Sequence, residues 1–263
     1  MRILNVGLVA MAGMMAAPAA FAVDGRALSE LAPTGRIRIA LVEAPNSGVF
    51  FVGRAPDGAP KGVTRDLGDA LAKALGVPVA FRIFPNSGEA TEATRKAEID
   101  LAFMPVDATR RELLAFGPGY YDLESTYLVT GTSGVSDVKE VDRAGMRVVG
   151  IAGTTTIRAS ARTLTKTQPQ PVASVAEAIA MMKDGRADAF ALSRDSLAPV
   201  RDQVPGSRIV SGGFQHTAVA VAVPKDRPAA LAFATDWLTG AKRDGTVRRI
   251  FDAHGLAEEK VAD

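Results

Sequence analysis

Apolar and polar positions in the first half of the chain follow two different periods. Short apolar runs rich in Val, Ile and Phe predict strands at residues 36–42, 79–84 and 100–104. Amphipathic stretches predict helices at residues 64–75, 89–97 and 108–114. This order, in which each strand is followed by a helix, predicts a parallel sheet with helices on its faces.

The second half of the chain continues this alternation. The runs expected to be strands are residues 125–130, 147–151, 172–173, 187–192, 208–210 and 217–223. The segments expected to be helices are residues 153–164, 174–183, 195–204, 228–241 and 246–253. The pattern predicts an α/β protein, and the length of 263 residues allows either one large domain or two smaller ones.

Several helix boundaries have recognisable capping residues. Thr64 and Asp107 are in N-cap positions, and Gly76 is in a C-cap position. Ser174 and Glu177 have the spacing of a capping box. These residues predict where the helices of the alternating pattern begin and end.

One element occurs twice. Residues 98–110 read EIDLAFMPVDATR and residues 185–197 read GRADAFALSRDSL, with Asp100 matching Asp188. Ligands of open parallel sheets bind beyond the carboxyl ends of the strands. Two facing sheets would therefore place the loops that follow these two strands in one shared cleft. The alternative, that the likeness is only the common helix-to-strand pattern of α/β folds, stays open.

The N-terminus has the features of a secretory signal peptide. Arg2 is followed by an apolar stretch, and Ala20-Phe21-Ala22 is a small-x-small cleavage site. A membrane anchor is the alternative, but the stretch ends at Pro18 and is shorter than the roughly 20 residues of a membrane span. We therefore expect cleavage after Ala22 and a periplasmic location.

Composition argues against several function classes. A net charge of +2 gives no electrostatic footprint for nucleic acid, and the absence of cysteine excludes disulfides, thiol catalysis and cysteine-based metal sites. His216 and His254 have no ligand-like spacing, and no nucleophile elbow, phosphate loop or dinucleotide loop is present. We expect no catalytic residue, no metal and no cofactor, which favours binding over catalysis.

Two features suit an anionic ligand. Residues 153–156, Gly-Thr-Thr-Thr, follow a strand and open a helix, so Thr154 and Thr155 can offer free N–H groups, hydroxyls and the helix dipole to a carboxylate. Arg110 lies in the first turn of its helix, and its planar guanidinium matches a carboxylate. Ordinary N-capping and a solvated arginine are the respective alternatives.

The chain also resembles a known family over residues 30–256. The segments that carry the resemblance are TGRIRIAL, GAPKGVTRDLGDALAKALG, AEIDLAFMPVDATRRELLAFGPGYY, GIAGTTT, VAEAIAMMKDGRADAF and AVAVPKD, in this order. They are similar to the family 3 extracellular solute-binding proteins, the periplasmic receptors of polar amino-acid ABC importers. The order and spacing of the segments are more specific than any one of them.

The resemblance implies the type II periplasmic-binding-protein fold. This fold has two lobes, each a mainly parallel sheet flanked by helices, joined by two hinge strands and closing on a ligand. Lobe one would comprise residues 23–122 and 218–263, and lobe two residues 123–217. The implied function is capture of a small solute by a monomer and its delivery to an ABC permease in the inner membrane.

Carried over by position, the resemblance also implies the binding residues. Arg110 corresponds to the arginine that clamps the carboxylate of the ligand, with Thr154 and Thr155 binding the same group from lobe two. The remaining implied contacts lie in the loops around these residues: Glu43, Asn86, Ser87, Met104, Val106, Asp107 and Ser193.

The chain departs from the family pattern at the other end of the ligand. Ser193 stands where amino-acid receptors have an aspartate that pairs with the ammonium group, and a hydroxyl cannot neutralise that charge. Asp195 is two residues further on and is expected to cap the next helix, and Glu43 is the stronger competitor. We therefore expect small carboxylates with hydroxyl, keto or amide groups to bind better than free α-amino acids.

Two alternatives to a transport receptor remain. Periplasmic dehydratases that resemble this family place a carboxylic acid at the position of Ser193, so this chain lacks the expected proton donor. A sensor component that presents a bound ligand to a receptor has no distinguishing feature in the sequence. A neighbouring permease gene and ATPase gene would favour transport over sensing.

Overall fold

A single mixed sheet runs through the computed structural model, which describes residues 23–43 and 51–262. Its order is β4-β1-β5-β11-β6-β9-β7-β8, with β10 added beside β6. The strands are β1 (Ile37–Val42), β4 (Val79–Phe84), β5 (Leu101–Pro105), β6 (Leu114–Val129), β7 (Val148–Ile151), β8 (Gln170–Val172), β9 (Ala189–Ser193), β10 (Arg208–Ile209) and β11 (Gln215–Pro224). A separate hairpin pairs β2 (Gly53–Arg54) with β3 (Pro60–Lys61).

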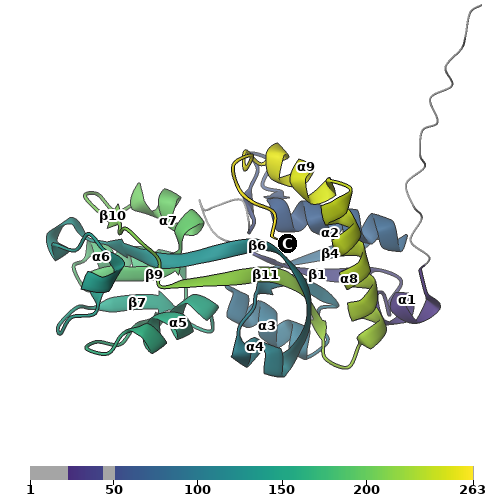
Figure 1. The fold of residues 1–263 in the computed structure, drawn as a ribbon, viewed down its shortest axis with the longest axis horizontal. Helices are drawn as coiled ribbons and strands as arrows, with labels where there is room; N and C mark the ends of the chain where they lie inside the picture. Colours follow the sequence, from purple (N-terminus) through teal and green to yellow (C-terminus); the bar gives the residue numbers. More distant parts are fainter. Residues whose placement is uncertain (1–22, 44–50, 263) are drawn as a thin grey trace, which may run out of the picture.

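Helices cover both faces of this sheet (Figure 1). They are α1 (Gly25–Leu31), α2 (Val63–Leu75), α3 (Ser87–Arg95), α4 (Ala108–Leu113), α5 (Thr155–Thr163), α6 (Val175–Lys183), α7 (Arg194–Arg201), α8 (Pro228–Arg243) and α9 (Thr246–Ala253). Two short 3₁₀ turns, Gly131–Ser133 and Val138–Val141, follow β6.

The sheet is parallel within each half and antiparallel where the halves join. β1 pairs in parallel with β4 and β5, and β7 pairs in parallel with β8 and β9. The long strands β6 and β11 pair antiparallel with each other and with their outer neighbours β9 and β5. Both strands run from one half to the other in Figure 1. The expected parallel order therefore holds for the outer strands of each half and fails for β6 and β11 at the junction and for β10, which pairs antiparallel with β6.

The apolar cores follow the same division. One pair of clusters takes its side chains from residues 27–123 and 219–251, and the other pair from residues 127–210. We call these halves lobe one and lobe two. The lobe boundaries expected from the resemblance fall inside β6 and β11.

Strand β6 is longer than its sequence pattern predicts. Only residues 125–130 were expected to be a strand, because Gly117-Pro118-Gly119 interrupts the apolar run. The structure accommodates this segment with register shifts against β11, where Tyr121 pairs with Val219 and Gly119 with Ala220. Bulges of this kind tolerate proline and glycine within a strand.

The expected caps are present except at Thr64. Gly76 ends α2 with a left-handed φ of 75°, and the Asp107 side chain accepts a hydrogen bond from the first turn of α4. Ser174 caps α6, but Glu177 accepts from the backbone of Ala173 instead of completing the box on Ser174. α2 begins at Val63, so Thr64 is inside the helix rather than at its cap.

The N-terminal helix and the β2–β3 hairpin were not expected. α1 is only 7 residues long, too short for a clear helical period, and it is held by an Asp24 cap and by buried Ala27 and Leu31. The signal peptide expected at residues 1–22 lies outside the described residues. Within residues 23–43 and 51–262, no helix is long and apolar enough to cross a membrane.

Candidate ligand-binding site between the lobes

A small cavity of about 50 Å³ lies between the two lobes. Lobe one lines it with β1, the segment around Phe51 and the start of α3, and lobe two with the ends of β7 and β9 and the starts of α5 to α7. Six of the residues expected at the site border this cavity: Glu43, Asn86, Ser87, Thr154, Thr155 and Ser193. The cavity is far smaller than the roughly 300–1,000 Å³ of ordinary ligand pockets, so a solute enters only if the lobes move apart.

The N-terminus of α5 forms the lobe-two wall. Thr154 is its N-cap, and its hydroxyl accepts from the Ile157 amide at 3.2 Å and donates to the Ile151 carbonyl at 2.8 Å. Thr155 and Thr156 occupy the first turn, where backbone N–H groups lack partners within the helix. The end of the helix dipole therefore faces the cavity and favours a negative charge.

Arg110 is the most deeply buried cation of the candidate site, with 1% of its surface exposed. It donates from Nη1 to the Pro105 carbonyl and from Nη2 to the Ser87 hydroxyl, each at 2.7 Å, and from Nη2 to the Gly153 carbonyl at 3.4 Å. All three acceptors are neutral, and Nε has no acceptor among the described residues.

Burial has an electrostatic consequence for Arg110. Loss of hydration lowers its pKa to about 9, the positive charge of Arg158 adds to the decrease, and Asp107 partly opposes it. The guanidinium remains charged at neutral pH. A buried charge without an ionic partner is costly, so an anion placed here would remove an existing cost as well as add a contact.

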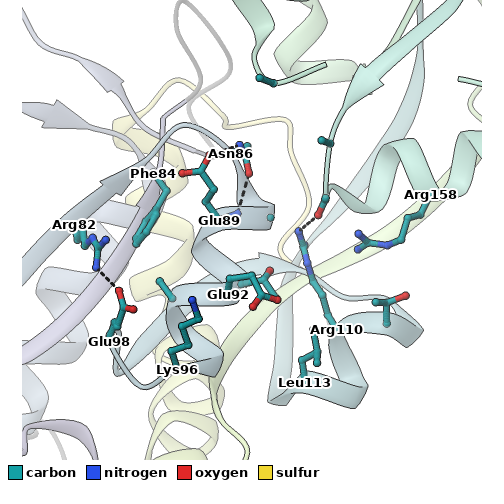
Figure 2. A pocket seen from close by; sticks show the side chains of 17 residues that line it. Arg82, Phe84, Asn86, Glu89, Glu92, Lys96, Glu98, Arg110, Leu113 and Arg158 are labelled. Atoms are coloured by element: carbon teal, nitrogen blue, oxygen red, sulfur yellow. Dashed lines mark hydrogen bonds and ion pairs between the residues drawn. The ribbon is translucent and has the colours of Figure 1, made fainter. Parts of the chain in front are cut away.

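A larger open hollow of about 690 Å³ lies on the other side of Arg110. Figure 2 shows Arg110 and Arg158 on one side of it and charged side chains of the α3 region on the other. Arg82 and Glu98, on its far side, are paired with each other at 2.8 Å. Arg110 borders this hollow while its partner Ser87 borders the cavity, so the guanidinium lies in the wall between them. We place the candidate site at the cavity, because hydroxyls of both lobes converge only there.

Four expected residues have other surroundings. Arg110 and Asp107 are not in the lining of the small cavity, and Asp107 caps α4 and contacts Arg158. Met104 is buried in β5 beside Thr91, and the Val106 carbonyl accepts from Thr217 at 2.7 Å.

The acidic residues expected near the cavity are either paired or placed elsewhere. The Glu43 carboxylate accepts from Arg54 Nε at 2.7 Å, which leaves it partly neutralised. Residues 44–46 of the same expected loop lie outside the described residues. Asp195 does not border the cavity, and it is not the cap of α7, because that helix begins at Arg194 and Ser193 occupies the N-cap position. The expected capping role of Asp195 is therefore wrong.

Asp195 is an unusual carboxylate. Both of its oxygens are buried and have no hydrogen-bond partner among the described residues. Burial raises its pKa, Glu259 adds to the increase, and the nearby Ser193 hydroxyl and first-turn amides of α7 partly oppose it. Ser193 itself donates to the Ser196 hydroxyl at 2.8 Å, and both residues line the cavity.

Two residues were missed in the sequence: Ser196, which borders the cavity, and Arg158, which borders the larger hollow. Ser196 follows Ser193 by three residues, the spacing that places both on one side of the first turn of α7. Arg158 follows Thr154 by four residues and so shares its helix face. Helical spacing from the expected residues was the available signal. Within the described part of the chain, no group of three or more potential metal ligands is assembled.

A cavity between two lobes joined by long shared strands is the arrangement of a bilobed solute-binding protein. The sequence profile of the bacterial extracellular solute-binding proteins, family 3, matches residues 50–257, and the chain belongs to this family. No curated protein sequence gives a significant match.

Solved structures share the fold. The solute receptor for L-cysteine of Neisseria gonorrhoeae has a TM-score of 0.78 at 19% identity, with 90% of this chain and 99% of that chain covered. The ancestral amino acid-binding protein AncCDT-1, a precursor of cyclohexadienyl dehydratase, has a TM-score of 0.73 at 24% identity, covering 86% and 98%. Holo ArgBP from T. maritima has a TM-score of 0.71 at 20% identity, covering 85% and 99%. The fold is thus that of the type II periplasmic binding proteins.

Proposed function

We propose that this protein is a periplasmic receptor that captures a small carboxylate-bearing solute between its lobes and delivers it to an ABC importer. The observation that carries the proposal is Arg110, a buried cation whose hydrogen bonds all go to neutral acceptors. The N-terminus of α5 lies across the cleft from it and adds a second element that favours a carboxylate. Export after cleavage at Ala22, a monomeric state and an inner-membrane permease complete the proposal.

The other residues that line the cavity support a ligand without an ammonium group. Ser193 and Ser196 offer hydroxyls there, and among the described residues of the wall the only carboxylate, Glu43, is bound by Arg54. Burying an ammonium against hydroxyls alone would cost several kcal/mol. Carboxylates with hydroxyl, keto or amide groups are therefore the proposed class, although the relatives named above are described as binding amino acids.

A thermal-shift panel tests this function directly. Amino acids and their α-hydroxy, α-keto and amide analogues are added to the mature protein and to an Arg110→Met variant. A solute at 100 times its Kd stabilises by about 2.7 kcal/mol, which for this size corresponds to roughly 5–10 °C in melting temperature. Shifts in the wild type that vanish in Arg110→Met support the receptor. Equal shifts in both proteins would exclude a clamp at Arg110.

An enzyme is the second candidate, favoured by two observations. AncCDT-1 is described as a precursor of a dehydratase, and Asp195 is a buried carboxyl whose raised pKa suits a proton donor. Its separation from the cavity lining argues against that role. Product analysis after incubation with hydroxylated cyclohexadienyl carboxylates separates the two candidates, because only an enzyme would release water from them.

A further inference from the structure

One ion pair near the candidate site joins the two lobes. Arg158 on α5 of lobe two binds Asp107 at the start of α4 in lobe one, with Nε donating to Oδ2 at 2.8 Å and Nη2 donating to the same oxygen. The Asp107 side chain is 6% exposed and that of Arg158 is 25% exposed, so water screens the pair only partly.

The same carboxylate also holds the helix that carries Arg110. Oδ1 of Asp107 accepts from the backbone N–H of Arg110 at 2.8 Å, which leaves Oδ2 for Arg158. Asp107 therefore connects the first turn of α4 to α5, the helix whose N-terminus contains Thr154 and Thr155. Both elements proposed to bind the carboxylate meet at this one residue.

The surrounding contacts show that the lobes touch here. Arg110 reaches the Gly153 carbonyl of lobe two, and the backbones of Gly88 and Gly153 approach so closely that a Cβ on Gly88 would lie 3.0 Å from the Gly153 Cα. In Figure 2 the Arg158 side chain points toward Arg110. With Arg158 neutralised by Asp107, the remaining positive charge of this cluster is on Arg110.

We propose that Arg158 is a positioning residue that forms, with Asp107, a latch between the lobes. The latch holds the closed arrangement and sets Arg110 opposite the N-terminus of α5. Its role in retaining a solute rests on the proposed function, but the latch acts on the lobes whether or not a solute is bound.

Distance measurements between spin labels test the latch without any solute. The chain has no cysteine, so labels at Lys96→Cys in lobe one and Lys183→Cys in lobe two are unique. These two exposed positions report lobe separation in the wild type, Arg158→Gln, Asp107→Asn and the double variant. Asparagine remains a good N-cap, so Asp107→Asn removes the charge while α4 stays capped.

We expect the ligand-free wild type to populate a short distance, and both single variants to shift the distribution to longer distances by similar amounts. The double variant should shift it no further, because either change alone breaks the pair. Arg158→Lys should restore part of the short population, and Arg162→Gln, an exposed arginine on the same helix, should leave it unchanged.

Three results would overturn the latch: a wild-type distribution without the short distance, an Arg158→Gln distribution equal to that of the wild type, or additive shifts in the double variant. For solutes identified by the thermal-shift panel, dissociation from Arg158→Gln should be about 5-fold to 100-fold faster. Unchanged dissociation would remove the latch and leave the receptor function intact. If no solute in the panel binds, the spin-label distances still test the latch.

Discussion

The Arg110 guanidinium and the Ser87 hydroxyl lie 2.7 Å apart, in the wall between the interlobe cavity and the outer hollow. Ser87 is the first residue of α3 and Arg110 belongs to α4, so two helices of lobe one hold the cation in place. A neutral hydroxyl orients the guanidinium without neutralising it. The charge therefore has no ionic compensation from Ser87.

Replacing Arg110 should lower solute affinity without lowering the stability of the protein. The alternative left open by the sequence was a solvated arginine, but the side chain is buried. Arg110→Met keeps most of the volume and removes an uncompensated buried charge, so we expect the ligand-free variant to be at least as stable as the wild type. Solute affinity should fall by at least about 1.5–3 kcal/mol, the scale of a charged hydrogen bond.

Chemical denaturation and calorimetry measure these two effects. Arg111→Met, which changes an exposed arginine beside it, is the control and should alter neither quantity. A large loss of stability in Arg110→Met with normal affinity would make Arg110 a structural residue only.

Asp195 should make stability depend on pH. Its pKa is raised by burial in the folded protein, whereas the unfolded chain has an ordinary value of about 3.9. The stabilising contribution of the bound proton is complete below that ordinary value and is lost as the pH rises through the raised one. Asp195→Asn cannot ionise, so at pH 7 it should be more stable than the wild type, because it avoids burying a charged carboxylate.

Thermal melts of both proteins from pH 3 to pH 8 measure this difference. The gap should close toward pH 3, where the wild-type carboxyl is also neutral. Asp184→Asn changes an exposed aspartate, and it should follow the wild type at every pH. A variant that is less stable than the wild type at pH 7 would show that the carboxylate has a partner that favours its charged form.

The glycine contact should control closure of the lobes. A Cβ at Gly88 would lie 3.0 Å from the Gly153 Cα and 3.1 Å from the Gly153 carbonyl oxygen, closer than ordinary packing allows. Gly88 has no left-handed backbone strain, so Gly88→Ala should hold the lobes apart while the Asn86 side chain, whose Oδ1 would lie 3.1 Å from the new Cβ, shifts slightly at the cap of α3. Small-angle scattering should give a larger radius of gyration for the variant at saturating solute.

Gly25→Ala is the matched control, since nothing lies within 4 Å of the Cβ it would add. Wild-type protein should compact when a solute from the panel is added, and Gly88→Ala should compact less. Superimposable curves for the two proteins would show that this contact does not limit closure.

The sequence predicts the local elements of this fold better than the way they join. Strand and helix periods are sufficient to locate the elements within each lobe, because the β-α alternation buries one face of each element. The crossing from one lobe to the other was missed, because the bulges around Gly119 and Tyr121 in β6 hide a long strand behind turn-like residues. β11 lies antiparallel between β5 and β6, and it pairs there with strands that are distant from it in the sequence. No local sequence pattern predicts such long-range pairing.

The candidate site was predictable where it follows strand ends and caps. Thr154, Ser87 and Ser193 border the cavity because each lies at the start of a helix. Contacts between the lobes were not predictable: the pair of Asp107 and Arg158 joins residues 51 positions apart on different lobes. The burial of Arg110 depends on the same approach of the lobes.

The last prediction concerns Ser193. Its hydroxyl and that of Ser196 are hydrogen-bonded to each other at 2.8 Å, and both residues line the cavity. A hydroxyl pair can accept from or donate to a hydroxyl, keto or amide group, but it cannot neutralise an ammonium. We therefore expect the wild type to bind α-hydroxy acids more tightly than the matching α-amino acids.

Ser193→Asp should reverse this preference. The new carboxylate would stand where an ammonium can pair with it, at the cost of repelling a ligand that lacks a positive charge. Paired thermal-shift series on both proteins measure the reversal as a change in the order of each hydroxy and amino pair. Ser193→Asn, which adds similar bulk without charge, separates electrostatics from size. If the wild type binds an ordinary amino acid tightly and Ser193→Asp changes nothing, Ser193 is not the discriminating residue, and Glu43, released from Arg54, becomes the group to substitute.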